Sequence, residues 1–169
     1  MRLISWNLNG RRRDATAQVE ALLVRAPEVI ALQEVTRSSL PSLRHALERG
    51  GLTEMADSFE LAPPVFEPRG PRRYGQLTAS RYPLTPQTPS LVPVPWAERV
   101  LTVRLDAGAH SVILYNTHVP PGSSNGWIKI DMLNVIFGAL AVHSETPRIL
   151  CGDFNTPQFE TAAGEVVTW

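Results

Sequence analysis

Alternation of strand-like and helix-like segments constrains the fold of the N-terminal part of the chain. Residues 2–6 fit a first strand, and residues 28–32 are a short apolar run that fits a buried strand. Apolar residues at helical spacing follow each of them. These helical positions are Val19, Leu22, Leu23 and Ala26 in the first predicted helix, and Leu40, Leu43, Ala46 and Leu47 in the second. Asp14 can cap the first helix, and Gly50-Gly51 can end the second. This order predicts an α/β layered fold.

The rest of the chain continues the pattern on either side of a proline-rich segment. Nine of the fifteen prolines lie between residues 63 and 95, where we predict loops with short strands at 75–80 and 84–87. The elements predicted after this segment are an antiparallel pair at 99–105 and 110–117 around Asp106-Ala107-Gly108, a helix from Asn125 to about His143 with Ile136, Phe137 and Leu140 inward, and a strand at 148–151.

Length and composition limit the class of protein. A chain of 169 residues with 43% hydrophobic and 19% charged residues fits one globular domain, residues 1–169. Sixteen basic and sixteen acidic residues cancel, so a strongly basic nucleic-acid footprint is absent. No run of apolar residues is long enough to span a membrane, and residues 1–5 lack the apolar core of a signal peptide. We therefore expect a cytoplasmic protein with no membrane partner.

The segment Cys151-Gly152-Asp153-Phe154-Asn155 carries the clearest chemical signal. It follows an apolar run, and strand alternation predicts that Asp153 and Asn155 point to the same side. Gly152 allows the backbone to bend or to be approached closely. Cys151 is the only cysteine, and its apolar flank predicts a buried, unreactive thiol. The alternative interpretation of the Asp and Asn residues is a turn.

Four polar clusters occupy the carboxyl ends of predicted strands. They are Asn7 with Asn9, Glu34, His118, and Asp153 with Asn155. Strand ends are where ligand groups converge in layered α/β folds. Singly, each cluster has another explanation: a turn at Asn7 to Gly10, a solvent-facing Glu34 and a structural His118. Together they predict one shared site.

The residue types indicate which chemistry this site can perform. Oxygen ligands without cysteine favour Mg²⁺, Mn²⁺ or Ca²⁺ over zinc, and Glu34 with amide neighbours suits Mg²⁺. Asp153 can orient or deprotonate a water molecule, while Asn155 and His118 can donate to phosphoryl oxygens. Arg11, with Arg12 and Arg13, can attract a phosphate chain or form a solvated helix entry.

Two further residues border the predicted site. Trp127 can stack on a nucleic-acid base, or it can pack the start of its helix. Lys129, the only lysine of the chain, can reach a phosphate or lie in solvent. Both follow His118 in the sequence, and both interpretations stay open for each.

The motifs and their order resemble the endonuclease/exonuclease/phosphatase superfamily. They are Ser5-Trp6-Asn7-Leu8-Asn9-Gly10, Leu32-Gln33-Glu34, Gly75 to Ser80-Arg81-Tyr82-Pro83-Leu84, Asn116-Thr117-His118-Val119-Pro120 and Gly152-Asp153-Phe154-Asn155. The opening is most similar to the exonuclease III-like apurinic/apyrimidinic endonuclease branch. The resemblance implies a four-layer α/β sandwich of the deoxyribonuclease I-like type and metal-dependent hydrolysis of a phosphodiester, DNA or RNA included.

The resemblance also implies roles for individual residues. Asn7 and Glu34 match the family's metal-side residues, Asp153 its water-positioning carboxylate and Asn155 the adjacent amide. His118 stands where the endonuclease branch has tyrosine and several phosphatase branches have histidine. Asn9 stands where some members have aspartate.

One departure concerns the part of the family's pattern that follows Gly-Asp-Phe-Asn. Family members continue with further strands and a terminal Ser-Asp-His element, whereas no histidine of this chain follows Asp153. We therefore expect a fold that is incomplete at its C-terminal side, with a sheet edge open to a second copy or a partner chain. The alternative function is a phosphate- or nucleic-acid-binding remnant with impaired catalysis.

Overall fold

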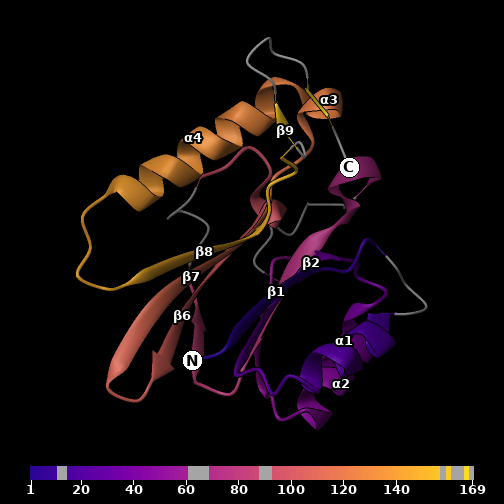
Figure 1. Ribbon diagram of the computed structural model, residues 1–169, viewed down its shortest axis with the longest axis vertical. Coiled ribbons are helices and arrows are strands. Elements are labelled where there is room, and N and C mark those ends of the chain that lie inside the picture. Colours follow the sequence, from indigo (N-terminus) through magenta and orange to yellow (C-terminus); the bar gives the residue numbers. More distant parts are fainter. Residues whose placement is uncertain (11–14, 61–68, 88–92, 157–158, 161–165, 168–169) are drawn as a thin grey trace.

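The computed structural model describes residues 1–10, 15–60, 69–87, 93–156, 159–160 and 166–167 (Figure 1). Two four-stranded sheets form its centre. The first has the order β1-β2-β4-β3, with bounds Leu3–Asn7, Val29–Val35, Gly75–Ser80 and Glu54–Asp57. The second has the order β5-β6-β7-β8, with bounds Leu84–Pro86, Val100–Ala107, His110–His118 and Arg148–Asp153. A separate antiparallel pair consists of β9, Phe159–Glu160, and β10, Val166–Val167.

Helices cover the outer face of each sheet. Their bounds are Ala15–Leu23 for α1, Leu40–Arg49 for α2, Gly122–Asn125 for α3 and Trp127–Ala141 for α4, and 3₁₀ turns occupy Gly70–Arg73 and Ala97–Arg99. Figure 1 shows α1 and α2 on one side of the paired sheets and α4 on the other. This arrangement is a four-layer α/β sandwich, which confirms the predicted fold class.

Apolar clusters between the layers hold the sandwich together. Val19, Leu43 and Leu77 belong to the cluster between the first sheet and its helices. Leu101, Val103 and Leu114 belong to the cluster between the two sheets. Met132 and Ile136 of α4 pack with Tyr115 and Val119 against the second sheet. Burial of apolar surface on both faces of each sheet is the main stabilising contribution to such a fold.

Each sheet contains one parallel pair of strands, and these pairs position the candidate site. β1 pairs in parallel with β2, and β7 pairs in parallel with β8. A parallel pair requires a crossover connection, which α1 provides in the first sheet and α4 in the second. In the register of the second pair His118 lies opposite Asp153. The carboxyl ends of all four strands therefore meet at one end of the sandwich.

Most predicted helices and strands are present, and the exceptions have local causes. Glu34 lies inside β2, where the pairing with β4 shifts register between Leu32 and Val35. The first helix ends at Leu23, so Ala26 is exposed, and its φ is +48°. Asn125 belongs to α3 and does not cap α4, which begins after Gly126. The strand β3 was not predicted, since its four residues carry too little pattern.

Two further predictions were wrong in detail. Phe137 was predicted to face inward, but its side chain is 73% exposed because the neighbouring Ile136 occupies the inward position of α4. The turn between β6 and β7 lies at Gly108-Ala109, since Ala107 already pairs with His110. The predicted cap residue Asp14 lies outside the described residues.

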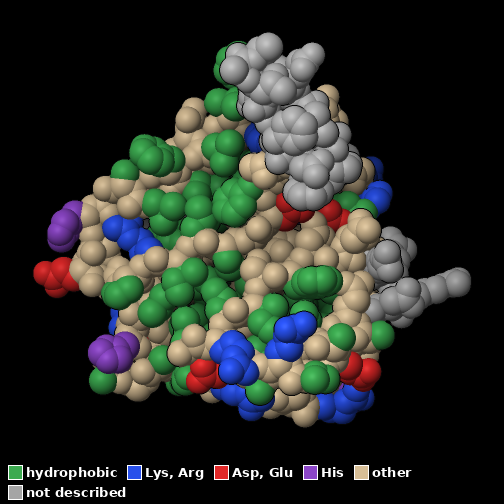
Figure 2. All heavy atoms as spheres, in the orientation of Figure 1, with side chains coloured by type: hydrophobic (Ala, Val, Ile, Leu, Met, Phe, Trp, Pro, Cys, Tyr) green, Lys and Arg blue, Asp and Glu red, His purple; other side chains and the backbone are tan. Residues whose placement is uncertain are grey.

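The strand β1 is an edge strand of the first sheet, and β8 is an edge strand of the second. Among the described residues, no strand pairs with the outer edge of either one. On the face shown in Figure 2, hydrophobic side chains gather over α4 and over the strands next to it. The described helices include none that is both long and apolar enough to cross a membrane.

Candidate functional site

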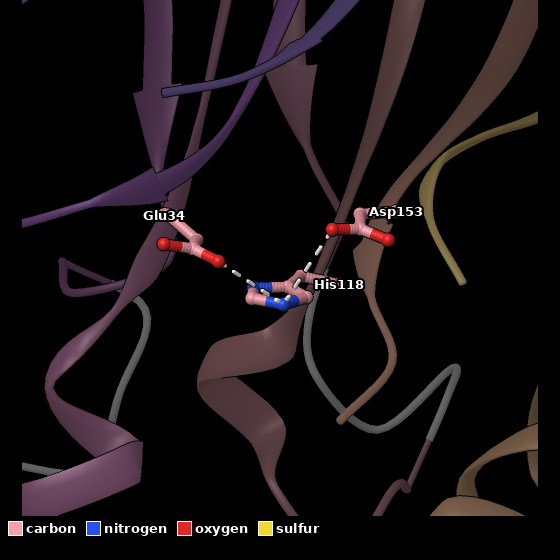
Figure 3. Close-up of side chains that lie close together, drawn as sticks. All are labelled: Glu34, His118 and Asp153. Carbon is pink, nitrogen blue, oxygen red and sulfur yellow. Dashed lines mark ion pairs between the residues drawn. The ribbon is translucent and has the colours of Figure 1, made fainter. Parts of the chain in front are cut away.

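Glu34, His118 and Asp153 meet at the carboxyl ends of β2, β7 and β8. Each offers one possible ligand atom, and these atoms all lie within 4.8 Å of one another. The Nε2 atom of His118 lies 3.6 Å from Oε1 of Glu34 and 3.9 Å from Oδ2 of Asp153. Figure 3 shows the two carboxylates approaching the imidazole from opposite sides. Two strands of one sheet and one of the other therefore build a single polar centre.

Asn7, at the end of β1, joins this centre through its amide. Its Nδ2 donates to Oδ2 of Asp153 at 2.6 Å and to Oε1 of Glu34 at 3.2 Å. Its Oδ1 accepts a hydrogen bond of 2.7 Å from the backbone N–H of Asn9. The Asn9 backbone therefore fixes which end of the Asn7 amide faces the carboxylates.

Three residues of the site hold a left-handed backbone that non-glycine residues seldom adopt. The φ angles are +54° at Asn9, +56° at Glu34 and +47° at Asn155. Glu34 lies at the register shift of β2, and such bulges re-aim a side chain at the rim of a sheet. Backbone strain of this kind concentrates at functional sites.

Asn155 lies beyond the last residue of β8 and is held by three hydrogen bonds. Its N–H donates to Oδ1 of Asp153 at 2.8 Å, and its Nδ2 donates to the carbonyl of Val119 at 2.8 Å. Its carbonyl accepts from Nζ of Lys129 at 2.8 Å. Both carboxylate oxygens of Asp153 therefore accept hydrogen bonds, one from Asn155 and one from Asn7, which orients the carboxylate.

Arg99 is a buried cation beside this centre, and sequence reasoning did not identify it as a site residue. Only 3% of its surface is exposed, and its guanidinium lies 5.6 Å from the Trp96 ring and 5.7 Å from the Tyr74 ring. Its Nη1 contacts Nδ1 of His118. Burial lowers the pKa of Arg99, although the nearby carboxylates oppose this.

His118 is neutral at physiological pH. Burial, and then the positive charge of Arg99, lower its pKa from 6.5 to about 4, while Asp153 acts in the opposite direction. The imidazole is only 4% exposed, so its surroundings rather than water decide its protonation.

A cavity of about 220 Å³ opens beside the polar centre. Glu34, His118 and Asn155 line it, and Tyr74 and Trp96 add aromatic surface. Pro120 and Pro121, which follow β7, also contribute to the wall. The cavity therefore combines charged, donor and aromatic groups at the strand ends.

The remaining residues predicted for the site lie at its border or outside the described residues. Lys129 contacts the Asn155 carbonyl, while Trp127 at the start of α4 is 79% exposed and is not among the residues that line the cavity. Arg11 lies outside the described residues. No sequence signal pointed to Tyr74 and Trp96, since Tyr74 lies within the proline-rich segment that was predicted to be mainly loop and Trp96 directly follows it.

The described centre has the donor chemistry for a hard divalent cation. One carboxylate oxygen of Glu34 and one of Asp153 lie within 4.8 Å of each other, and Nδ2 of Asn7 donates a hydrogen bond to each carboxylate. Carboxylate oxygens suit hard cations such as Mg²⁺ or Mn²⁺ better than softer metals. Opposed carboxylates repel one another, so a cation is the ligand that this arrangement favours.

One known protein family matches nearly the whole chain. The family model described as Endonuclease/Exonuclease/phosphatase family matches residues 4–163. A search of curated proteins found no match. The matched range includes all the motifs that carried the resemblance in the sequence.

Three solved structures share the fold. An endonuclease/exonuclease/phosphatase protein from Beutenbergia cavernae is 19% identical, with a TM-score of 0.65, 97% of this chain covered and 50% of that one. An AP endonuclease from Archaeoglobus fulgidus is 20% identical, with a TM-score of 0.64 and coverage of 94% and 59%. A variant of the 3′ phosphatase NExo from Neisseria, bound to a product DNA hairpin, is 20% identical, with a TM-score of 0.58 and coverage of 94% and 59%.

The present chain thus spans between half and about three fifths of the length of these solved proteins. Identity at this level relates the folds, and the family assignment comes from the matched model. That match extends over nearly all of the sequence, from β1 to the residues after β8. The chain belongs to the Endonuclease/Exonuclease/phosphatase family.

Proposed function

We propose that residues 1–169 form one domain that hydrolyses a phosphodiester with the help of Mg²⁺ or Mn²⁺. The observation that carries this proposal is the convergence of Glu34, His118 and Asp153, with possible ligand atoms within 4.8 Å of one another. The family match supports the same chemistry in general terms. Nucleic acid is the proposed substrate class, since one of the structural relatives is an AP endonuclease and another is bound to a product DNA hairpin.

Glu34 and Asp153 are the proposed carboxylate ligands of the cation. The Asn7 amide would join them through Oδ1 only after a turn of the amide, since Nδ2 now donates to both carboxylates. When bound, the ion stabilises the negative charge that develops on the phosphoryl oxygens. Asp153 orients the attacking water molecule and accepts its proton, because its carboxylate is already fixed by Asn7 and Asn155. His118 and Asn155 donate to the phosphoryl oxygens. Asn9, Arg11 and Lys129 are the proposed contacts to the rest of the substrate, and Trp127 is a proposed stacking surface for an unpaired base.

Turnover with defined metals tests this proposal. The purified chain is assayed with a chromogenic phosphodiester and with single-stranded, duplex and abasic DNA and RNA, in Mg²⁺, Mn²⁺ or EDTA. We expect metal-dependent hydrolysis that falls roughly 100-fold or more in Glu34→Gln and Asp153→Asn, as loss of one transition-state contact typically does. Glu54→Gln is the matched control, since Glu54 is an exposed glutamate of β3. Wild-type turnover equal to that of Glu34→Gln would overturn the proposal.

A second candidate is binding of a phosphodiester without turnover. Hydrogen-bond donors that can hold a phosphoryl group, His118 and Asn155, line the cavity and would support binding whether or not turnover follows. Calorimetric titration with Mn²⁺ and then with an oligonucleotide separates the two functions. Binding that Glu34→Gln abolishes, with hydrolysis at background, supports the second candidate over the first.

We also propose that a further polypeptide can pair with the outer edge of β1 or β8. No described strand occupies either edge, and edge strands carry backbone donors and acceptors able to pair with another chain. Light scattering across a concentration series tests whether the further polypeptide is a second copy. A monomer at all concentrations would exclude pairing between copies.

A further inference from the structure

Arg99 and His118 are in direct contact, and the chemistry of the two groups decides where the imidazole proton lies. Nη1 of Arg99 meets Nδ1 of His118. A guanidinium has only N–H donors and stays protonated in proteins. Nδ1 must therefore accept this hydrogen bond and carry no proton. A neutral imidazole then holds its single proton on Nε2.

The Nε2 side of the ring faces the candidate metal centre. Nε2 lies 3.6 Å from Glu34 Oε1 and 3.9 Å from Asp153 Oδ2, which is longer than an ordinary hydrogen bond to either carboxylate (Figure 3). The N–H is thus aimed at the space between the two carboxylates. A nitrogen that carries a proton has no lone pair for a metal ion.

The position of Arg99 is itself strongly determined. Its side chain is buried against the rings of Trp96 and Tyr74. The preceding residue, Glu98, is also buried and forms two hydrogen bonds with Arg72 at 2.7 and 2.8 Å. These contacts hold the guanidinium in one orientation next to the imidazole, and a flexible lysine ammonium would not reproduce that geometry.

We propose that Arg99 is a positioning residue that holds His118 as its Nε2–H tautomer, so that His118 donates to a substrate phosphoryl oxygen and does not ligate the metal. This inference rests on the proposed function for the identity of the acceptor. It divides the cluster into the two carboxylate ligands, Glu34 and Asp153, and a hydrogen-bond donor, His118. Arg99 acts through His118; it also lines the cavity, so the KM of its variants decides whether it contacts the substrate as well.

Nuclear magnetic resonance of ¹⁵N-histidine-labelled protein tests the tautomer without any substrate. His118→Gln identifies the His118 signals among the four histidines. We expect a protonated Nε2 and an unprotonated Nδ1 at neutral pH, and we expect Mg²⁺ to leave the Nε2 proton in place. A proton on Nδ1, or Mg²⁺ coordination at Nε2, would overturn the inference even if the enzyme turns over substrate.

Arg99 variants test the link between the two residues. We expect Arg99→Met to give a mixture of His118 tautomers and to lower kcat by about 10- to 100-fold, as loss of an orienting partner does, with KM within about threefold. Arg99→Lys should restore the tautomer only in part. A raised KM with unchanged kcat would instead show that Arg99 binds substrate directly. If Arg99→Met does not fold, the wild-type tautomer and the Mg²⁺ response still decide the question.

Absence of turnover in the wild type, with the expected tautomer, would count against the proposed function and leave the role of Arg99 in placing the proton intact. Turnover in the wild type together with a proton on Nδ1 of His118 would support the proposed function and count against the role of Arg99. The two proposals therefore fail through different measurements.

Discussion

Gln33 and Asn116 join the two sheets directly behind the candidate site. Nε2 of Gln33 donates to Oδ1 of Asn116 at 2.8 Å, and both side chains are almost completely buried. Nδ2 of Asn116 donates in turn to the carbonyls of Leu32 and Leu77, each at 3.2 Å. Gln33 precedes Glu34, and Asn116 lies two residues before His118. A polar network in the core therefore fixes the spacing between the strands that carry the site.

Replacing Asn116 with leucine should destabilise the protein by about 3 kcal/mol, because buried donors and acceptors are left without partners. The same change should lower any hydrolytic activity, since β2 and β7 lose the contact that aligns Glu34 with His118. Urea unfolding followed by circular dichroism measures the first effect. Asn134→Leu is the control, since Asn134 is exposed on α4 and should change stability by less than about 0.5 kcal/mol. Equal midpoints for the two variants would contradict the prediction.

The free energy of unfolding should depend on pH because His118 is buried in its neutral form. The folded pKa of His118 is about 4, below its ordinary value of 6.5. Between these values the unfolded chain binds a proton that the folded chain excludes, so stability falls as pH decreases from 6.5 to 4 and the effect is complete below 4. At about 1.4 kcal/mol per pKa unit, the contribution is on the order of 3 kcal/mol.

Urea unfolding at several pH values in EDTA measures this contribution as a difference between variants. The wild type should lose stability relative to His118→Gln across this interval, because glutamine does not titrate. His143→Gln, which changes an exposed histidine, should follow the wild type. Parallel curves for wild type and His118→Gln would show that the His118 pKa is not lowered in the folded protein.

The Cys151 thiol should be unreactive in the folded protein. Burial raises its pKa from 9.0 to about 11. Because the thiolate is the nucleophile, two pKa units reduce the reactive fraction about 100-fold at neutral pH. A disulfide exchange reagent should therefore label the native protein at least about 100-fold more slowly than the urea-unfolded chain. Similar rates in the two states would mean that the region of β8 around Cys151 opens readily to solvent.

Local sequence pattern was sufficient to predict most of the sandwich. The helix that begins after Ser39 and ends before Gly50 buries Leu43, Ala46 and Leu47, as their spacing indicates. Strand ends could also be located closely enough to group Glu34, His118 and Asp153 as candidates. This works because both crossovers make parallel pairs, so a residue at the end of one strand meets a residue at the end of the next.

What the sequence did not reveal depends on contacts between distant residues. Arg99 was seen as the first residue of a strand, because nothing local indicates that Trp96 and Tyr74 will enclose its guanidinium. The register shift that re-aims Glu34 arises from pairing with β4, a strand far along the chain. The sequence could not show that Phe137 faces outward. Most residues of α4 are apolar, so their spacing does not indicate which face of the helix is buried.

Gly152 should tolerate no side chain, because the backbone of Thr117 occupies the space. A Cβ at Gly152 would lie 1.8 Å from the Thr117 carbonyl oxygen, and the φ of Gly152 is +140°. Gly152→Ala must therefore push β8 away from β7 or change the backbone, and we expect a loss of about 3 kcal/mol in the free energy of unfolding. Asp153 is the next residue and pairs with His118, so Gly152→Ala should also lower any hydrolytic activity.

Gly138→Ala provides the matched control for this substitution. Gly138 lies within α4, and apart from its chain neighbours and the backbone of its own helix, no heavy atom of the described residues lies within 4 Å of the position where its Cβ would be. Alanine is the better helix former, so this variant should be more stable than the wild type by up to about 1 kcal/mol. Thermal and urea unfolding of both variants give the comparison. If Gly152→Ala unfolds at the wild-type midpoint while Gly138→Ala behaves as expected, then β8 does not pass Thr117 as closely as described, and the placement of Asp153 beside His118 would need revision.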